Sequence, residues 1–244
     1  MAENYNSKHH IFSTRSNTTD NRADEKSQEQ DNTLEFDTDC KYYRNKGGRF
    51  LAKFNHDKNN NEIFSISKGI HKLTVLFHQS ANLIGKLVTV SQRPKDDFCG
   101  KSVAAYLDPI IDSVSFQSEN SKTVVEYTVT NNGVKARIII SEKTSDDYIT
   151  FDFHCENVYA RYDDFVKRVA FISNETNDEI FFINPPFIKT LNDNMPYKIA
   201  HTYKVLENGD VQVIIMTNDK QLDIVERTMP FTIEMQYTLS DDAV

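Results

Sequence analysis

The chain has 244 residues, of which 39% are hydrophobic, and a formal net charge of −8 at pH 7. This length suits one domain of about 150 to 200 residues with a tail, or two small domains. Phosphate contacts need a concentrated basic face, and none is visible in the sequence, so we expect no nucleic-acid binding. No apolar run reaches the length of a membrane span, so we expect no membrane-spanning segment.

The first 39 residues carry almost no apolar side chains. Such a segment cannot bury enough surface to offset the entropy of ordering, so residues 1–39 are predicted to be a disordered acidic tail. Its four basic and nine acidic side chains contribute −5 of the net charge, which leaves −3 for the rest of the chain. No hydrophobic stretch follows Met1, so we expect no standard secretory signal. His9-His10 could bind a metal weakly, although solvated side chains are expected here.

Residues 40–104 are predicted to be a region of strands that packs on the main domain. Gly47-Gly48, between apolar and aromatic residues, indicates a short hairpin. Alternating side chains over residues 62–69 and 71–80 predict two strands, and LVTV at 87–90 predicts another. The segment from residue 98 to residue 116 could hold either a strand or a short helical turn.

A polar stretch in this region resembles the start of a calcium loop. Asp57, Asn59 and Asn61 could present oxygen ligands at its first three positions. However, Glu62 stands where the loop needs Gly, and Lys68 stands where a bidentate Glu is needed. We therefore interpret the stretch as a polar turn and expect no metal site.

Residues 105–244 are predicted to form the main module, and its clearest signal is the stretch 124–140. Val125, Tyr127 and Val129 fall on one face of a strand. On the next run the side chains that share a face are Val134, Ala136, Ile138 and Ile140. Asn132-Gly133 between the runs predicts a hairpin with a type I′ turn, in which both residues take a positive φ.

The same alternation returns in the rest of the chain. One face of the next run carries Ile149, Phe151, Phe153 and Cys155. Further runs are predicted to reverse at Asn177-Asp178 and at Asn208-Gly209. The last run alternates through Phe231, Ile233, Met235, Tyr237 and Leu239. No window shows a helical period, so the predicted fold class is all-β, an antiparallel β-sandwich or a flattened barrel.

Proline positions predict where strands end. Pro185-Pro186 removes two N–H donors from any ladder, and Pro230 stands at the start of the last run. We interpret both positions as corners where the chain passes from one sheet to the other.

The chain has three cysteines, Cys40, Cys99 and Cys155, and no CxxC motif, which favours reduced structural thiols. A disulfide between two of them is the alternative. His154 and Cys155 are neighbours on a strand, so they point to opposite faces and cannot act as a nucleophile and its base. Cys155 is expected to be buried and inert, with His154 facing outward.

The sequence shows no recognised catalytic motif. Asp146-Asp147 and Asp163-Asp164 could be glycosidase-like carboxylates, but neighbouring aspartates in loops are usually solvated turn formers. GxSxG, GxGxxG, Walker and HExxH patterns are missing from the sequence. We therefore expect a protein that is not an enzyme and has no cofactor. The weakest alternative is a hydrolase whose active-site residues are scattered along the sequence.

Exposed aromatic side chains offer another possibility, because sugars stack on aromatic rings. The candidate ligand-binding residues are Tyr42, Tyr43, Tyr159 and Tyr162. The chain has no Trp, and most of its aromatic residues alternate as core residues. A carbohydrate-binding, lectin-like β-sandwich is therefore the alternative function.

Five motifs succeed one another along residues 106–239. They are VEYTVTNNGVKARIII, YITFDFHCEN, IFFINPPFIKT, NGDVQVIIMTNDKQL and RTMPFTIEMQ. In this order they resemble the β-rich region upstream of the DNRLRE-type domain in wall-associated and Rhs (YD-repeat) type bacterial surface proteins. The chain departs from that pattern at Gln221-Leu222, where the family has a Trp, and at Asn184, where it has Pro.

The resemblance implies a non-catalytic structural or interaction module. It also implies a cell-surface or secreted location, with a protein or a cell-envelope glycan as the partner.

Overall fold

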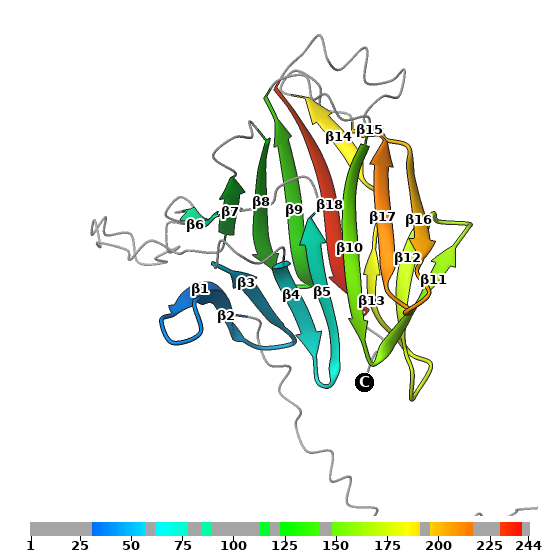
Figure 1. Cartoon of the computed structure of the whole chain (residues 1–244), viewed down its shortest axis with the longest axis horizontal. Coiled ribbons are helices and arrows are strands. Elements are labelled where there is room, and N and C mark those ends of the chain that lie inside the picture. The colour runs from blue at the N-terminus through cyan, green and yellow to red at the C-terminus, as the bar shows by residue number, and fades with distance from the viewer. Residues whose placement is uncertain are drawn as a thin grey trace, which may run out of the picture.

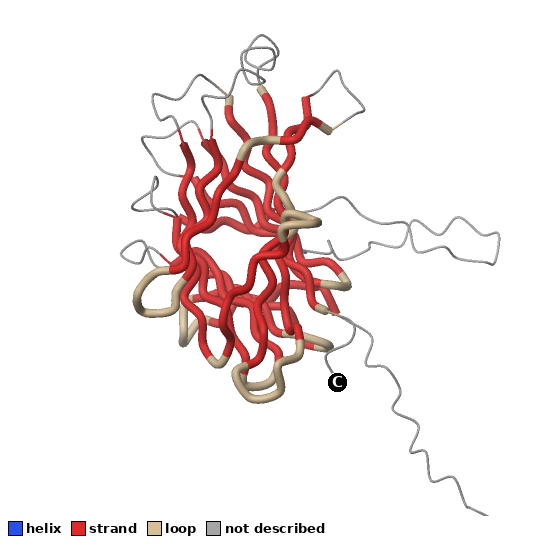
Figure 2. The backbone as a smooth tube through the Cα atoms, turned by 90° about the vertical axis from the view of Figure 1, so that its right-hand side faces the viewer, coloured by secondary structure: helices blue, strands red, loops and turns tan. Residues whose placement is uncertain are grey.

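The structure is a computed structural model of the chain, and it describes residues 31–56, 62–77, 84–88, 113–117, 123–141, 148–190, 196–216 and 230–240. All regular secondary structure in these ranges is β-strand, and all strand pairs are antiparallel. The strands form two facing layers (Figure 1, Figure 2). The prediction of an all-β sandwich is confirmed. Within the described ranges, no helix has the length and apolar character needed to cross a membrane.

Within the part of the chain that the structure describes, sheet A has eight strands in the order β1-β2-β3-β4-β5-β10-β17-β16. Their bounds are β1 (Asp31–Asp37), β2 (Tyr42–Gly47), β3 (Leu51–Asn55), β4 (Glu62–Lys68), β5 (His71–Phe77), β10 (Tyr148–Glu156), β16 (His201–Val205) and β17 (Val211–Met216). β5 pairs with β10 from Phe77–Phe151 to Lys72–Glu156. The strands of residues 40–104 and those of residues 105–244 therefore share one sheet.

Sheet B has ten strands among the described residues, and the order across it is β11-β12-β13-β18-β9-β8-β7-β6. Their bounds are β6 (Ile84–Val88), β7 (Ser113–Gln117), β8 (Thr123–Thr130), β9 (Gly133–Ile140), β11 (Val158–Asp163), β12 (Arg168–Ser173), β13 (Glu179–Ile183) and β18 (Phe231–Leu239). The remaining two are β14 (Phe187–Thr190), which pairs with β18, and β15 (Tyr197–Lys198), which pairs with β14. β18 is central because it pairs with β9 along one side and with β13 and β14 in turn along the other.

The core lies between the sheets, where the apolar side of each strand faces inward. Val125, Tyr127 and Val129 are all buried, as the alternation predicts. Aromatic rings join the two layers: the Phe64 ring centroid lies 4.7 Å from that of Tyr127 and 5.0 Å from that of Tyr237. Such contacts add about 0.5–1.5 kcal/mol each to the free energy of apolar burial.

The start of the folded region differs from the prediction. Residues 31–37 were expected to belong to the disordered tail, but they form β1, which pairs with β2 and buries Leu34. With only two apolar residues, this segment lacks a strand pattern of its own, and pairing with β2 supplies the missing stabilisation. Residues 38–39 of the predicted tail lie in the turn after β1, and residues 1–30, with His9-His10, lie outside the described residues.

The hairpin of β8 and β9 is confirmed, but its predicted type I′ turn is wrong. Thr130 pairs with Gly133, so Asn131 and Asn132 form the loop. Neither asparagine is among the described residues with positive φ, whereas Gly133 has a φ of 146°. A Cβ at Gly133 would lie 1.9 Å from the carbonyl oxygen of Tyr237. Glycine is required because β18 passes too close to leave room for a side chain.

The other predicted reversals are confirmed. β2 and β3 are joined at Gly47 and Gly48, with φ of 118° and 116°. The β12–β13 connection contains Asn177 with a φ of 60°, and the β16–β17 connection contains Gly209 with a φ of 86°.

One of the two proline interpretations is wrong. Pro185 and Pro186 lie between β13 and β14, and both of these strands pair with β18 in sheet B. The prolines therefore interrupt a ladder within one sheet, because they have no N–H to donate. At Pro230 the interpretation is right, since the chain passes from β17 in sheet A to β18 in sheet B, and Pro230 immediately precedes β18.

Candidate functional site

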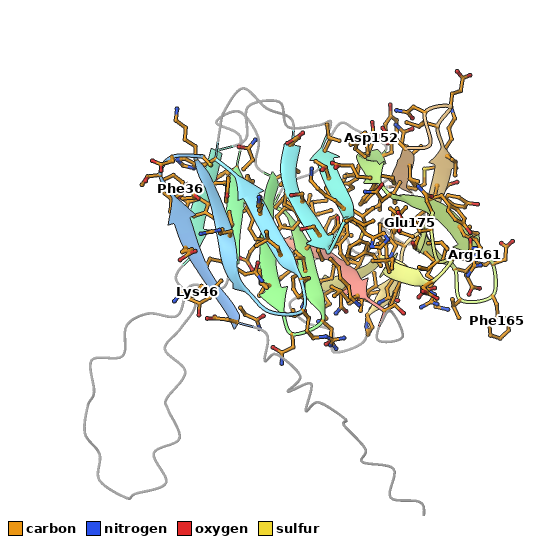
Figure 3. All side chains as sticks on the ribbon, turned by 90° about the horizontal axis from the view of Figure 1, so that it is seen from below. Phe36, Lys46, Asp152, Arg161, Phe165 and Glu175 are labelled. Carbon is orange, nitrogen blue, oxygen red and sulfur yellow. The ribbon has the colours of Figure 1, made fainter. Side chains whose placement is uncertain are left out.

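The four candidate tyrosines lie at opposite ends of the sandwich. Tyr42 and Tyr43 are on β2, next to the edge strand of sheet A, whereas Tyr159 and Tyr162 are on β11, the edge strand of sheet B. Figure 3 shows this separation, with Lys46 of β2 at one end and Arg161 of β11 at the other. The structure does not bring the two pairs into one platform.

At the β2 end, Tyr43 is not exposed as the sugar-binding hypothesis requires. It is only 9% exposed, and its ring centroid lies 4.8 Å from that of Phe36. Burial also raises the pKa of its hydroxyl. Tyr42 is half-buried, and the Lys53 ammonium lies 5.0 Å from its ring centroid. Only Tyr42 of this pair presents part of its ring to solvent.

At the β11 end, one tyrosine is exposed and the other is packed. Tyr159 is 41% exposed, and its hydroxyl lies 3.5 Å from Asn177 Oδ1. Tyr162 is half-buried and stacks on Tyr203 of β16, with ring centroids 4.3 Å apart. Tyr162 therefore joins the edges of the two sheets, and its stacked face is not available to a ligand.

The β11 end also carries a surface pocket of about 470 Å³. Three segments far apart in the sequence line it: the β11–β12 turn, the β13–β14 connection with the start of β14, and the β15–β16 region. The lining residues are Phe165, Val166, Lys167, Pro185, Pro186, Phe187, Pro196, Lys198, Ile199 and His201. We call this site the proline pocket.

A carboxylate fixes the turn that forms one wall. Asp163 Oδ1 accepts hydrogen bonds from the backbone N–H groups of Phe165, at 3.0 Å, and Val166, at 3.2 Å. This is the turn-forming role expected of Asp163-Asp164. Phe165 is 95% exposed, and Figure 3 shows its side chain projecting from the end of the molecule.

Among the described residues that line the pocket, the polar ones are Lys167, Lys198 and His201, and none is acidic. The nearest described partner of Lys167 is Asp164, whose Oδ1 accepts a hydrogen bond from the Lys167 ammonium at 3.3 Å. Both of these side chains are largely exposed, so solvent screens the pair. Two backbone oxygens face the His201 ring, that of Ile199 at 3.3 Å from Nδ1 and that of Lys167 at 3.4 Å from Nε2. His201 therefore ties β16 to the turn.

A second arrangement resembles a nucleophile and its base. His71 Nε2 lies 3.0 Å from Ser173 Oγ, and His71 Nδ1 lies 3.3 Å from the Lys68 carbonyl oxygen. Ser173 is completely buried, and its Oγ accepts backbone hydrogen bonds from Glu175 and Thr176. A substrate cannot reach it, so the pair connects β5 to β12 across the sandwich. Sequence reasoning missed this pair because 102 residues separate its members and no motif marks them.

His154 faces outward and Cys155 faces the core, as predicted from their adjacent positions. His154 Nδ1 lies 2.9 Å from Asp210 Oδ1, and the same oxygen accepts a hydrogen bond from the Cys155 backbone N–H. Cys155 is half-buried and not fully buried as expected, and burial, aided by the Asp210 charge, raises its pKa to about 12. The thiol therefore stays protonated at neutral pH and is a poor nucleophile.

The other candidates have different outcomes. Cys40 is exposed, with a free thiol. Asp57, Asn59, Asn61, Cys99, Asp146 and Asp147 lie outside the described residues. Within the described ranges, no group of three or more His, Cys, Asp or Glu side chains is arranged to hold a metal ion.

Comparisons with known proteins give no relative. No protein-family model, no curated protein and no solved structure matches the chain.

Proposed function

We propose that this chain is a non-catalytic interaction module that binds its partner at the proline pocket and the adjoining Phe165. The observation that carries the proposal is the 95% exposure of Phe165 at the rim of a pocket walled mainly by Pro, Phe, Val and Ile. Burying such a side chain against a partner would contribute about 1.5–3 kcal/mol to the binding free energy, because in the free protein the side chain is in contact with water. A concave apolar site with a few polar groups is the common form of a binding site.

The partner is proposed to belong to a bacterial cell envelope, as a protein or a glycan. The order of the five motifs supports this proposal through its resemblance to wall-associated and Rhs-type surface proteins. The two-sheet sandwich supports it as well, because a rigid scaffold can present a binding turn at one end.

Co-sedimentation with isolated bacterial envelopes tests the proposal. Phe165→Ser should reduce the bound fraction at least tenfold, because it removes the exposed apolar group. Ile70→Ser is the matched control, since Ile70 is also exposed but lies in the β4–β5 turn. Equal binding by the Phe165→Ser variant and the unmodified chain would contradict the proposed site.

Carbohydrate binding is the second candidate, and the exposed ring of Tyr159 favours it. Tyr159 lies on β11, the strand that leads into the turn bearing Phe165. On a glycan array, this candidate predicts binding that Tyr159→Ala abolishes and that Tyr42→Ala, at the far end, leaves unchanged. An array on which the unmodified chain binds no glycan removes it.

A further inference from the structure

The proline pocket combines an apolar body with a cationic rim, and we propose that it takes a small amphipathic carboxylate, an alkyl or aryl group ending in one carboxylate. The inference rests on the proposed function: the envelope protein or glycan presents this carboxylate group to the pocket, and the inference adds the chemical class of that group. The two parts of such a ligand match two separate features of the pocket.

The apolar part of the ligand matches the size and walls of the pocket. Its volume of about 470 Å³ lies within the range of about 300–1,000 Å³ that is usual for small-molecule sites. Phe165 and Val166 come from the β11–β12 turn, and Phe187 and Ile199 come from the other two segments. Prolines complete the walls without exposing N–H groups that would need a polar partner.

The charge of the ligand is inferred from the rim. Lys198 is exposed, and its ammonium has no hydrogen bond or ion pair with any residue in the described ranges. Phe187 pairs directly with Lys198 between β14 and β15, so an aromatic ring and a positive charge are neighbours. Lys189, whose ammonium lies 5.6 Å from the Phe187 ring, already bonds Glu234. Lys198 is therefore the cation best placed to pair with an anion.

A carboxylate fits this rim better than a phosphate. Phosphate sites often add arginine side chains or several backbone N–H groups to any lysine that they contain. The lining residues that the structure describes contain no arginine, and three of them are prolines. One available ammonium suits a ligand with a single negative charge.

Isothermal titration calorimetry of the full chain with octanoate, octanol and octylammonium tests the inference. Octanoate should bind with one-to-one stoichiometry, octanol should bind at least fivefold more weakly, and octylammonium should not bind. Lys198→Gln and Phe165→Ser should each raise the Kd of octanoate at least fivefold. The effect of Lys198→Gln should shrink in 0.5 M NaCl, because salt screens the charge pair.

Lys46→Gln is the control for the lysine variant. It removes the same charge from an exposed lysine at the opposite end of the molecule (Figure 3), so the Kd of octanoate should not change. Circular dichroism checks that each variant is folded. The inference is overturned if octanoate does not bind, if octanol or octylammonium binds as tightly, or if Lys198→Gln leaves the Kd unchanged.

The envelope experiment separates this inference from the proposed function. If octanoate fails to bind but envelope binding still depends on Phe165, only the ligand class is wrong. If both measurements fail, the pocket is not the binding site.

Discussion

Two tyrosines place hydroxyl groups in the core without hydrogen-bond partners in the described part of the chain. Tyr127 and Tyr237 are buried, and both rings pack on Phe64. An unpaired buried hydroxyl costs about 1–3 kcal/mol of desolvation. Burial raises the pKa of both hydroxyls, so they stay protonated in the folded state.

Tyr237→Phe is therefore expected to keep or raise the free energy of unfolding at pH 7, by up to about 1 kcal/mol. Because the folded pKa lies above the unfolded value, ionisation of Tyr237 has no effect on stability below about pH 10 and lowers the free energy of unfolding as the pH rises further. The variant should accordingly lose less stability above pH 10 than the unmodified chain. Urea unfolding at pH 7 and pH 10.5 measures both effects. A loss of more than about 1 kcal/mol at pH 7 would reveal a hydrogen-bond partner for the hydroxyl.

Gly133 shows what a sequence can and cannot tell about one position. The Asn-Gly pair correctly predicts a reversal, but the need for glycine comes from the Tyr237 carbonyl on β18, which is 104 positions further along the chain. Local turn statistics contain no information about such a distant strand.

Gly133→Ala should lower the free energy of unfolding by about 3 kcal/mol or more, because a backbone atom, not a flexible side chain, blocks the Cβ. Gly69→Ala is the comparison. Gly69 also has a positive φ, of 58°, but nothing lies within 4 Å of the added Cβ, so its cost should be about 1 kcal/mol. Equal losses for the two variants, measured by urea unfolding, would rule out the clash.

Strands were predictable where alternation was strong, as in β8, β9, β10 and β18. Alternation does not predict a strand whose formation depends on a neighbouring strand: β1 becomes a strand because β2 lies beside it. It also fails where a register shift occurs, as between Phe171 and Ile172, so that five consecutive residues of β12 are buried. Residue periodicity cannot predict such shifts, because they depend on the neighbouring strand.

Three strands of sheet B are linked by charge on its outer face. Glu234 of β18 is almost fully buried and forms ion pairs with Lys135 of β9, at 3.0 Å, and Lys189 of β14, at 3.1 Å. Burial alone would raise the pKa of Glu234, but the hydrogen bonds from the two lysines outweigh it and lower the pKa. The carboxylate therefore stabilises the fold when it is ionised.

Glu234→Gln should reduce the free energy of unfolding at pH 7 by about 1–3 kcal/mol. The lowered folded pKa means that the contribution is present above the unfolded value of about 4.5 and is lost as the pH falls through the folded value. The difference in the free energy of unfolding between the variant and the unmodified chain should thus shrink below about pH 4.5. Glu35→Gln, which breaks an exposed pair with Arg44, should cost less than about 1 kcal/mol. A deficit of Glu234→Gln that does not change with pH would contradict this assignment.

The architecture of the whole molecule was predictable as a class but not as a topology. Alternation shows that two apolar faces must cover each other, which favours a sandwich. It does not show that β5 pairs with β10, or that strands from both halves of the chain contribute to both layers. The proline pocket was missed for the same reason: it gathers residues 165–167, 185–187 and 196–201, and only the tertiary structure brings these segments together.

Hydrogen–deuterium exchange of the full chain, with and without isolated bacterial envelopes, tests most directly whether this pocket is the binding site. We predict that envelopes slow exchange in the β11–β12 turn and in the segments around Phe187 and His201, while β1 and β2 at the opposite end exchange as in the free protein. Protection centred on β1 and β2, or no protection anywhere, would contradict the proposed function.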